Sequence, residues 1–501
     1  MAFDSRGGRG GKGLSVLIVG TGFSGLGMAI QLKQAGFEDF TILERAGDVG
    51  GTWRDNSYPG CACDVQSHLY SYSFEPNPNW SRMFAPQPEI KAYLQHCARK
   101  YGLLPHIRYN AELVRAEYDE KDALWNVTTR AGETYSASVL VSGMGGLSTP
   151  AFPSIKGLEA FKGKMFHSAH WDHGHDLEGE RVAVIGTGAS AIQFVPKVAQ
   201  KAARLDLYQR TATWILPKPD REISAAERLL FRRFPAAQRA LRNSIYWMLE
   251  SRVLGFVINP RVMKLVERQA RGHIRRQVKD PVLRKKLTPD YTIGCKRILI
   301  SDDFYPAVSR ANVDVITDGI REIRAHSVVD VNGVEREVDT IILGTGFKAQ
   351  DPMPRGAIFG RGGQDLLDAW TDGPEAYKGT TVAGFPNFYV LMGPNTGLGH
   401  SSMVYMIESQ IQYVLDALQA MRRDGLRSLE VRPEAQARYN AGLQQKLGKA
   451  VWQSGCKSWY VNEAGKNTTL WPGFTFRFRE LTRQVELVDY QTEPRVATAK
   501  A

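Results

Sequence analysis

Two glycine-rich turns have the spacing of dinucleotide-binding sites. The first, Gly20-Thr-Gly22-Phe23-Ser-Gly25, follows the apolar run 15–19 and precedes an apolar helical pattern that ends near residue 33. Glycine lets the backbone approach a pyrophosphate, and the start of the next helix offers free N–H groups. The apolar run 40–43 then ends in Glu44, whose carboxylate can accept a hydrogen bond from a ribose hydroxyl. This pattern predicts a βαβ unit that binds a dinucleotide.

The second turn repeats this design with one change in chemistry. Gly186-Thr187-Gly188-Ala-Ser190-Ala191 follows the apolar run 181–185 and precedes another helical pattern. Arg210, followed by Thr211, stands 24 residues after Gly186, and Glu44 stands 24 residues after Gly20. A guanidinium can bind a 2′-phosphate through two parallel hydrogen bonds. We therefore expect the second site to take NADPH rather than NADH.

Two further stretches have specific patterns. Between the two turns, Phe161, Gly163, His167, Trp171 and Asp172 match the pattern F-x-G-x-x-x-H-x-x-x-W-[PD]. After Glu44, residues 50–64 match [AG]-G-x-W-x-x-x-x-[FY]-P-[GM]-x-x-x-D. Both patterns resemble the signatures of the Baeyer-Villiger monooxygenases, flavoenzymes that insert one oxygen atom of O2 next to a ketone carbonyl. A linker with a buried Trp, and a turn capped by Asp64, are the alternative interpretations. The resemblance extends from residue 16 to about residue 487.

The resemblance assigns FAD to the first turn and NADPH to the second. It implies that Asp64 lies beside the flavin and orients Arg297, and that Lys296 helps to hold the 2′-phosphate. The implied FAD-binding residues are Gly20, Gly22, Phe23, Gly25, Glu44, Gly51, Thr52, Trp53, Asp64 and Tyr70. The implied NADP-binding residues are Gly186, Thr187, Gly188, Ser190, Ala191, Arg210, Thr211, Lys296, Arg297 and Trp459. Tyr70 and Trp459 are equally compatible with core aromatic positions.

The reaction that the resemblance implies uses Arg297 and Asp64 as the catalytic pair. NADPH reduces FAD, O2 converts the reduced flavin to a C4a-peroxide, and this attacks the ketone to give a Criegee adduct and then an ester or lactone. Arg297, permanently charged, would stabilise both anions. His167 is assigned to the interdomain linker, where it would couple domain motion to turnover. Cyclic, aromatic and long-chain ketones all stay open as substrates.

Two other functions fit parts of the same pattern. A flavin-containing monooxygenase that oxidises nitrogen or sulfur has a similar linker signature, but it usually lacks the Trp171-Asp172 ending and does not share the Asp64 signature. A redox sensor that binds FAD and NADP without oxygenating a substrate would need only the two glycine turns. Bound flavin and oxygenated product distinguish these alternatives.

The chain length and the order of the motifs predict an α/β fold with two Rossmann-like dinucleotide-binding domains and a helical subdomain inserted in the NADP domain. The chain has 501 residues, too many for one compact core. We expect a flexible arm at 1–13, the first part of the FAD domain at 14–150, and the NADP domain at 151–338 with a helical insert at about 221–290. Residues 339–501 return to the FAD domain and form a C-terminal segment.

Charge and cysteine content narrow the partners and the compartment. The net charge is +12, yet no long basic block indicates nucleic acid, so cofactor phosphates and a solvated surface account for it better. The five cysteines are read as unpaired, Cys61 and Cys63 as structural, and no metal site is expected. We expect a cytoplasmic monomer whose partners are a ketone and O2. Residues 225–278 mix apolar and basic residues at helical spacing, which favours a solvated subdomain and leaves a membrane-surface role open.

Overall fold

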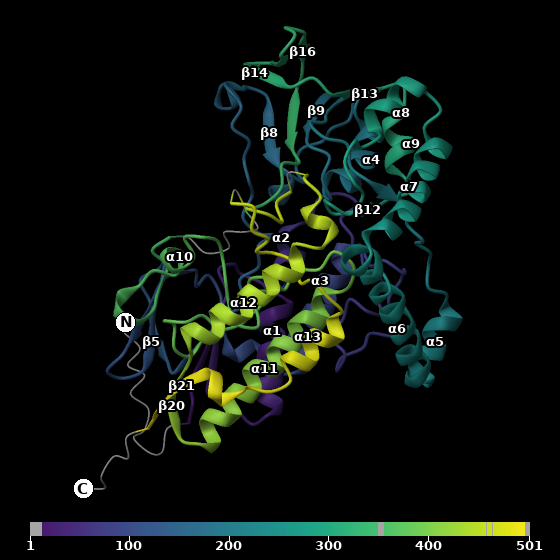
Figure 1. Cartoon of the computed structure of the whole chain (residues 1–501). Helices are drawn as coiled ribbons and strands as arrows, with labels where there is room; N and C mark the ends of the chain where they lie inside the picture. Colours follow the sequence, from purple (N-terminus) through teal and green to yellow (C-terminus); the bar gives the residue numbers. More distant parts are fainter. Residues whose placement is uncertain (1–12, 349–354, 457, 463, 496–501) are drawn as a thin grey trace, which may run out of the picture.

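Two five-stranded parallel sheets organise the chain (Figure 1). The computed structural model describes residues 13–348, 355–456, 458–462 and 464–495. The N-terminal arm expected at 1–13 lies outside the described residues, apart from Gly13. Each sheet contains the strand that leads into one of the two glycine-rich turns, so the predicted pair of dinucleotide-binding folds is confirmed.

The first sheet has the strand order β19-β7-β1-β2-β3. Its strands are β1 (Val16–Val19), β2 (Phe40–Leu43), β3 (Ile107–Arg108), β7 (Val139–Ser142) and β19 (Phe388–Val390). Helix α1 (Phe23–Gln34) follows β1 and packs against α11 (Met403–Arg423), while α3 (Gln87–Lys100) lies nearby. Because β19 and α11 come from the last third of the chain, the first sheet and its helical cover are complete only after the chain returns.

The second sheet has the strand order β13-β10-β9-β17-β8. Its strands are β8 (Lys164–His167), β9 (Arg181–Ile185), β10 (Arg204–Tyr208), β13 (Val313–Ile316) and β17 (Thr340–Leu343), with α4 (Ala191–Lys201) following β9. We placed residue 339 onward in the returning FAD domain, but β17 pairs in parallel with both β9 and β8. The crossover back to the first sheet therefore begins after Leu343.

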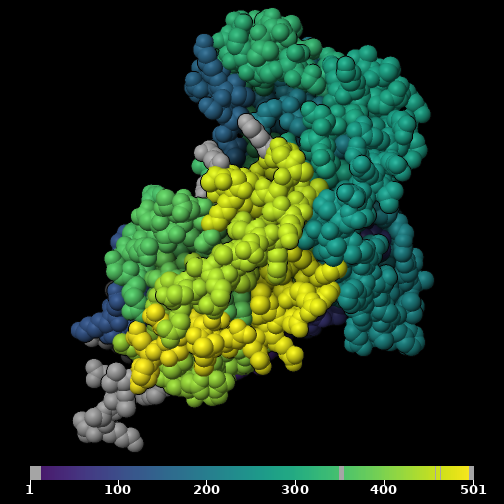
Figure 2. Space-filling model, in the orientation of Figure 1, coloured from purple at the N-terminus to yellow at the C-terminus, as the bar shows by residue number. Residues whose placement is uncertain are grey.

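A helical insert lies between β11 (Ile215–Leu216) and β12 (Leu299–Ile300). It contains α5 (Ala225–Arg233), α6 (Pro235–Glu250), the π-helical turn η4 (Leu254–Ile258), η5 (Pro260–Val262), α7 (Met263–Gln277) and α8 (Pro281–Leu287). Helix α5 begins with a capping box, in which Ser224 and Glu227 exchange hydrogen bonds. Figure 2 shows this insert as the teal surface along one side of the molecule.

Smaller sheets and short helices complete the fold. One sheet contains β4 (Leu113–Asp119), β5 (Leu124–Thr129), β6 (Thr134–Ala137) and β18 (Ile358–Phe359), a second contains β14 (Ile320–Arg324), β15 (Ser327–Asp330) and β16 (Glu335–Glu337), and a third contains β20 (Leu426–Val431) and β21 (Tyr490–Pro494). The other α-helices are α2 (Thr52–Asp55), α9 (Phe304–Val308), α10 (Leu366–Ala369), α12 (Pro433–Leu447) and α13 (Thr475–Leu481). Short 3-10 turns are η1 (Leu104–His106), η2 (Leu158–Ala160), η3 (Ser168–His170), η6 (Arg361–Gly363), η7 (Val451–Gln453) and η8 (Leu487–Asp489). None of the described helices is both long and apolar enough to cross a bilayer.

Candidate active site

The glycines of the first turn form a cradle that side chains would fill. Gly51 has φ +52°, and a Cβ there would lie 2.9 Å from the Cα of Gly22. A Cβ on Gly25 would lie 1.9 Å from the carbonyl oxygen of Gly20. The backbone is therefore bare where β1 meets α1, as a bound pyrophosphate requires. These residues fit FAD.

Glu44 lies at the carboxyl end of β2 with its carboxylate fixed. One oxygen, Oε2, accepts hydrogen bonds from the Thr21 backbone N–H at 3.0 Å and from the Thr21 hydroxyl at 2.5 Å. The other, Oε1, accepts from the Ala46 N–H at 2.9 Å and lies 2.8 Å from the Arg54 guanidinium. The position is the one predicted for binding a ribose, and a ribose hydroxyl there would share Oε2 with Thr21.

Three predicted flavin-site aromatics lie together next to this cradle. The Trp53 indole donates a hydrogen bond to the Tyr70 hydroxyl at 3.1 Å, and the Phe23 ring lies edge-on to Tyr70 at 5.2 Å between centroids. Thr52 begins α2, and its hydroxyl donates to the carbonyl of Leu147. The first turn and the signature at residues 50–64 therefore form one continuous surface.

Asp64 and Arg297, 233 residues apart, form an ion pair. An Nη atom of Arg297 donates to Oδ2 of Asp64 at 2.5 Å, and both side chains are about one-third exposed, at 37% and 30%. Burial opposes ionisation of Asp64, but the Arg297 charge and hydrogen bond outweigh it and lower the pKa of Asp64. The Asp64 charge raises the pKa of Arg297 further. The pair therefore presents a fixed, partly accessible cation beside the flavin-site aromatics.

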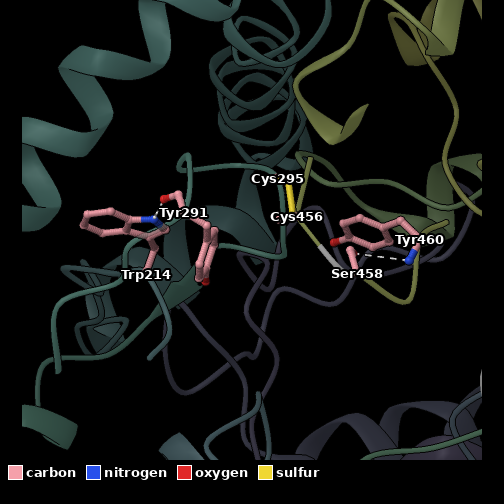
Figure 3. Close-up of a disulfide and its surroundings, with 6 residues drawn as sticks. All are labelled: Trp214, Tyr291, Cys295, Cys456, Ser458 and Tyr460. Carbon is pink, nitrogen blue, oxygen red and sulfur yellow. Dashed lines mark hydrogen bonds between the residues drawn. A yellow bond between two sulfur atoms is a disulfide. The ribbon is translucent and has the colours of Figure 1, made fainter. Parts of the chain in front are cut away.

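Tyr460 is a neighbour of this pair that sequence reasoning missed. Its side chain is fully buried, and burial raises its pKa to about 12 although the nearby Arg297 charge opposes the shift. The disulfide between Cys295 and Cys456 fastens the Arg297 turn to the segment that carries Tyr460 (Figure 3). This corrects our expectation that all five cysteines are unpaired. The two partners are 161 residues apart, so no local spacing indicates their contact.

The other three cysteines are free and buried, as expected for structural residues. Burial raises the pKa of the Cys61 thiol to about 12, and it also raises the pKa of Cys63. Thiols in this state are poor nucleophiles, because the thiolate is the reactive form. Cys61 and Cys63 therefore have no catalytic chemistry of their own.

The second turn has the same bare backbone as the first. Gly186 has φ +111°, and a Cβ there would lie 2.3 Å from the Gly344 carbonyl oxygen. A Cβ on Gly188 would have no atom within 4 Å, so this residue faces open space. Ser190 is the N-cap of α4 and makes no side-chain cap hydrogen bond, and the helix begins at the buried Ala191. The start of α4 is therefore open to a phosphate.

Arg210 lines a basic cleft beside this turn, and Lys296 lies close enough to Arg210 to interact with its charge. The cleft has a volume of about 800 Å³. It is lined by basic side chains of α7 and α8 and by residues after β10: Arg210, Thr211, Arg271, Arg275, Arg284, Lys285 and Lys286. Burial lowers the pKa of Lys296, and the Arg210 charge lowers it further, because the two cations repel each other. Thr211 also accepts a hydrogen bond from Thr187 through its backbone carbonyl at 3.2 Å. The residues fit a 2′-phosphorylated dinucleotide.

The linker signature lies at the edge of the second sheet and at the connections between the sheets. A Cβ on Gly163 would lie 2.3 Å from the Asp339 carbonyl oxygen, and the Phe161 ring is next to it. His167 ends β8 and contacts the rings of Phe152 and Phe347, which belong to the two connecting segments.

The end of the signature closes the same region. Trp171 packs against Phe166 and against Phe194 of α4, and Asp172 pairs with Lys164. The predicted interdomain position of the signature therefore agrees with its contacts. Trp459, in contrast, is 49% exposed and contacts the Tyr460 ring, so it lies near Arg297 without being part of the core.

Comparison with known proteins places this arrangement in a family. The model of the family described as flavin-binding monooxygenase-like matches residues 13–358. A Baeyer-Villiger monooxygenase of Pseudomonas aeruginosa is 63% identical over 477 residues, covering 95% of this chain and 90% of the relative. A Baeyer-Villiger monooxygenase of Streptomyces coelicolor is 50% identical, covering 95% and 92%.

Solved structures give the same result. Steroid monooxygenase bound to NADP has a TM-score of 0.86 at 30% identity, covering 97% of this chain and 100% of that one. Closed cyclohexanone monooxygenase has a TM-score of 0.86 at 26% identity, covering 96% and 99%. The chain has two dinucleotide-binding frames, each a parallel sheet with its glycine-rich turn, and the Asp64–Arg297 pair joins residues from different parts of the chain. Relatives match it along nearly its whole length. The chain therefore belongs to the flavin-binding monooxygenases, in their Baeyer-Villiger branch.

Proposed function

We propose that this protein converts ketones to esters or lactones with NADPH and O2, and that Arg297 is the cation on which the oxygen-insertion step depends. The Asp64–Arg297 contact carries the proposal, because it holds a permanent positive charge beside the aromatic cluster Phe23, Trp53 and Tyr70. Attack on a ketone carbonyl places negative charge on oxygen, and a preorganised cation stabilises that charge.

The neighbours of Arg297 keep its charge in one place. Asp64 accepts a hydrogen bond from one Nη of the guanidinium, and Tyr460 of the C-terminal segment lies close enough to interact with its charge. A guanidinium has five N–H donors, so these contacts leave others for the reacting oxygen. Asp64 is itself ionised in this setting because Arg297 lowers its pKa. Asp64 therefore positions Arg297 and accepts no proton from the substrate.

The two frames hold the cofactors. Residues of the first turn, with Glu44 and the aromatic cluster, would hold FAD, and residues of the second turn, with Arg210 and Lys296, would hold NADPH. When bound, these groups supply hydride transfer and the activation of O2. The protein supplies position, charge and exclusion of water.

Replacing Arg297 separates flavin reduction from oxygen insertion. We expect Arg297→Ala to keep its FAD and to be reduced by NADPH at a rate near the wild type, while ester formation falls about 100- to 1000-fold, as for loss of one oxyanion donor. Anaerobic stopped-flow absorbance measures reduction, and mass spectrometry of a ketone panel measures ester. Arg297→Lys keeps the charge but loses the planar fork, so we expect an intermediate rate.

Arg310→Ala is the matched control, because Arg310 is an exposed arginine at the far end of α9. It should change neither reaction. Asp64→Asn should resemble Arg297→Lys, since the guanidinium stays but loses its anchor. Ester formation by Arg297→Ala at a rate near the wild type, with normal FAD content, would remove Arg297 from the proposed role.

A further inference from the structure

The net positive charge of the chain is concentrated in the helical insert. Residues 225–287 contain sixteen Lys and Arg and four Asp and Glu, which gives +12. The rest of the chain contains 48 basic and 48 acidic residues and is neutral. Basic residues of α7 and α8 line the cleft at the second turn. None of the basic residues of α5 and α6 lines that cleft.

The same insert carries most of the exposed large apolar side chains. Eighteen such side chains are exposed among the described residues, and ten of them lie between residues 225 and 287. Five belong to the hairpin of α5 and α6: Leu229, Leu230, Phe234, Trp247 and Met248, which are 44–63% exposed. Single exposed apolar residues are ordinary, but a group of this size on two adjacent helices indicates an interaction surface.

Helix α6 has a solvent face of unusual composition. Its exposed positions are Pro235, Ala236, Arg239, Ala240, Asn243, Ser244, Trp247 and Met248, which repeat at helical spacing. A helix that faces only water normally carries charges of both signs there. Arg239 is the one charged residue of this face, and Glu250 is buried.

Helix α5 continues the pattern. Its exposed large side chains are Leu229 and Leu230, followed by Arg232 and Arg233, and Phe234 is exposed at the turn into α6. The acid of this helix, Glu227, is half-buried and pairs with Arg221. We call the eight exposed side chains Leu229, Leu230, Arg232, Arg233, Phe234, Arg239, Trp247 and Met248 the hairpin surface. All its charges are positive.

The opposite side of the hairpin is anchored in the protein. Gln238 donates to the Asn77 carbonyl at 2.7 Å, and Arg242 donates to the carbonyls of His68 and Ser71 at 2.7 and 3.1 Å. Ile245 and Leu249 are buried against Leu69. Figure 1 shows both helices at the edge of the molecule. The hairpin surface is therefore held rigidly and points outward.

We propose that the hairpin surface binds the interfacial region of an anionic phospholipid bilayer. Leucine, phenylalanine, tryptophan and methionine side chains partition into the headgroup and acyl boundary, and arginine is attracted to anionic headgroups. Nucleic acid is bound mainly through its phosphates, so it would leave most of these aliphatic side chains in water. A second copy of the chain is disfavoured as the partner. A two-fold contact would bring Arg232, Arg233 and Arg239 close to the same three arginines of the other copy, and these charges would repel. The docking is peripheral, since no described helix is long and apolar enough to span the bilayer.

Vesicle flotation of the FAD-loaded, full-length enzyme tests the proposal. We expect binding to vesicles of phosphatidylcholine with phosphatidylglycerol, weaker binding as NaCl rises, and little binding to phosphatidylcholine alone. R232E/R233E/R239E should lower the partition coefficient about tenfold or more. L229S/L230S/F234S tests the apolar part and should also weaken binding. FAD content, melting temperature and NADPH oxidation in vesicle-free buffer check that both variants are folded.

Matched controls come from the small sheet of β14, β15 and β16. R321E reverses an exposed arginine there, and V331S/V334S removes two exposed valines. Neither should change flotation. Three results would overturn the proposal: equal binding to neutral vesicles, equal loss with the control variants, or no binding to anionic vesicles. A dimer in light scattering that the hairpin variants dissociate, without vesicle binding, would identify a second copy as the occupant.

Discussion

At the scale of single residues, Arg210 and Lys296 are the pair that we propose to select NADPH over NADH. Arg210 occupies in the second frame the strand-end position that Glu44 occupies in the first. In the protein without cofactor, burial and the Arg210 charge both lower the pKa of Lys296. Two cations held close together repel each other, and a phosphate between them would relieve the repulsion. A 2′-phosphate supplies that charge, and a free ribose does not.

We predict that Arg210→Gln and Lys296→Met each raise the KM for NADPH about 10- to 100-fold, because each loses a hydrogen bond to a charged group. The KM for NADH should change little. Steady-state oxidation of both nucleotides measures this. Arg275→Gln is the control, since Arg275 lines the same cleft from α7. An equal effect in Arg275→Gln would mean that the general field of the cleft, and not direct contact, selects NADPH.

At the level of elements, the Cys295–Cys456 disulfide joins the turn before β12 to the segment after η7. Lys296 and Arg297 follow the first cysteine directly, and Trp459 and Tyr460 stand three and four residues after the second. Figure 3 shows the disulfide and Tyr460. The bond therefore couples the residues proposed to hold NADP and the reacting oxygen to the segment that covers them. Such coupling would keep water out during oxygen insertion.

We predict that C295S/C456S folds and binds FAD but forms more H2O2 per NADPH oxidised, with about tenfold weaker binding of NADP+, because the covering segment is no longer tethered. Peroxide assay and equilibrium titration measure these changes. Dithiothreitol should reproduce them in the wild type and should have no effect on the double variant. Unchanged coupling in C295S/C456S would mean that noncovalent contacts, such as those of Tyr460 with Arg297, hold the segment in place.

The elements with local signals could be predicted from sequence, and the contacts between distant segments could not. The turns at Gly20 and Gly186 each combine a buried strand, glycines and a helix within about 20 residues, so periodicity and glycine spacing reveal them. The Asp64–Arg297 pair followed only from family resemblance, because no local pattern links residues 233 positions apart. Tyr460 and Cys456 gave no such signal. Strand β17 looked like a returning strand because burial alone does not indicate which sheet a strand joins.

On the scale of the whole molecule, the two frames share one apolar cluster and are also joined by specific polar contacts. Gln193 of α4 accepts from the Tyr58 hydroxyl at 3.0 Å and donates to the Ala62 carbonyl at 3.0 Å. The two connecting segments run side by side, with Ala151 donating to the Gly346 carbonyl at 2.9 Å. His167 lies against these segments, and His68 lies under the helical insert. Both histidines are therefore buried where the parts of the molecule meet.

Burial keeps both rings in the neutral form. Nδ1 of His167 accepts from the Ala169 N–H at 3.0 Å, and Nδ1 of His68 faces the Gln238 amide at 3.2 Å. Neither Nε2 has a hydrogen-bond partner among the described residues. Burial is the main reason that the pKa of both rings falls from 6.5 to about 4. At His68, the charge of Glu227 raises the pKa, while the charges of Arg242 and Arg221 lower it. At His167, the charge of His170 also lowers the pKa. Charging either ring would cost a hydrogen bond and leave an unpaired buried cation.

We predict from this that acid weakens the fold between about pH 6.5 and about pH 4. In that window the two histidines are protonated in the unfolded chain and neutral in the folded chain. The free energy of unfolding therefore falls as pH falls, by at most about 3 kcal/mol per ring. H68Q/H167N keeps an acceptor at each position but cannot be protonated. Its melting temperature should therefore drop less than that of the wild type between about pH 7 and about pH 4.5. H326N, at an exposed histidine, is the control, and a double variant that loses as much as wild type would assign the acid sensitivity to other groups.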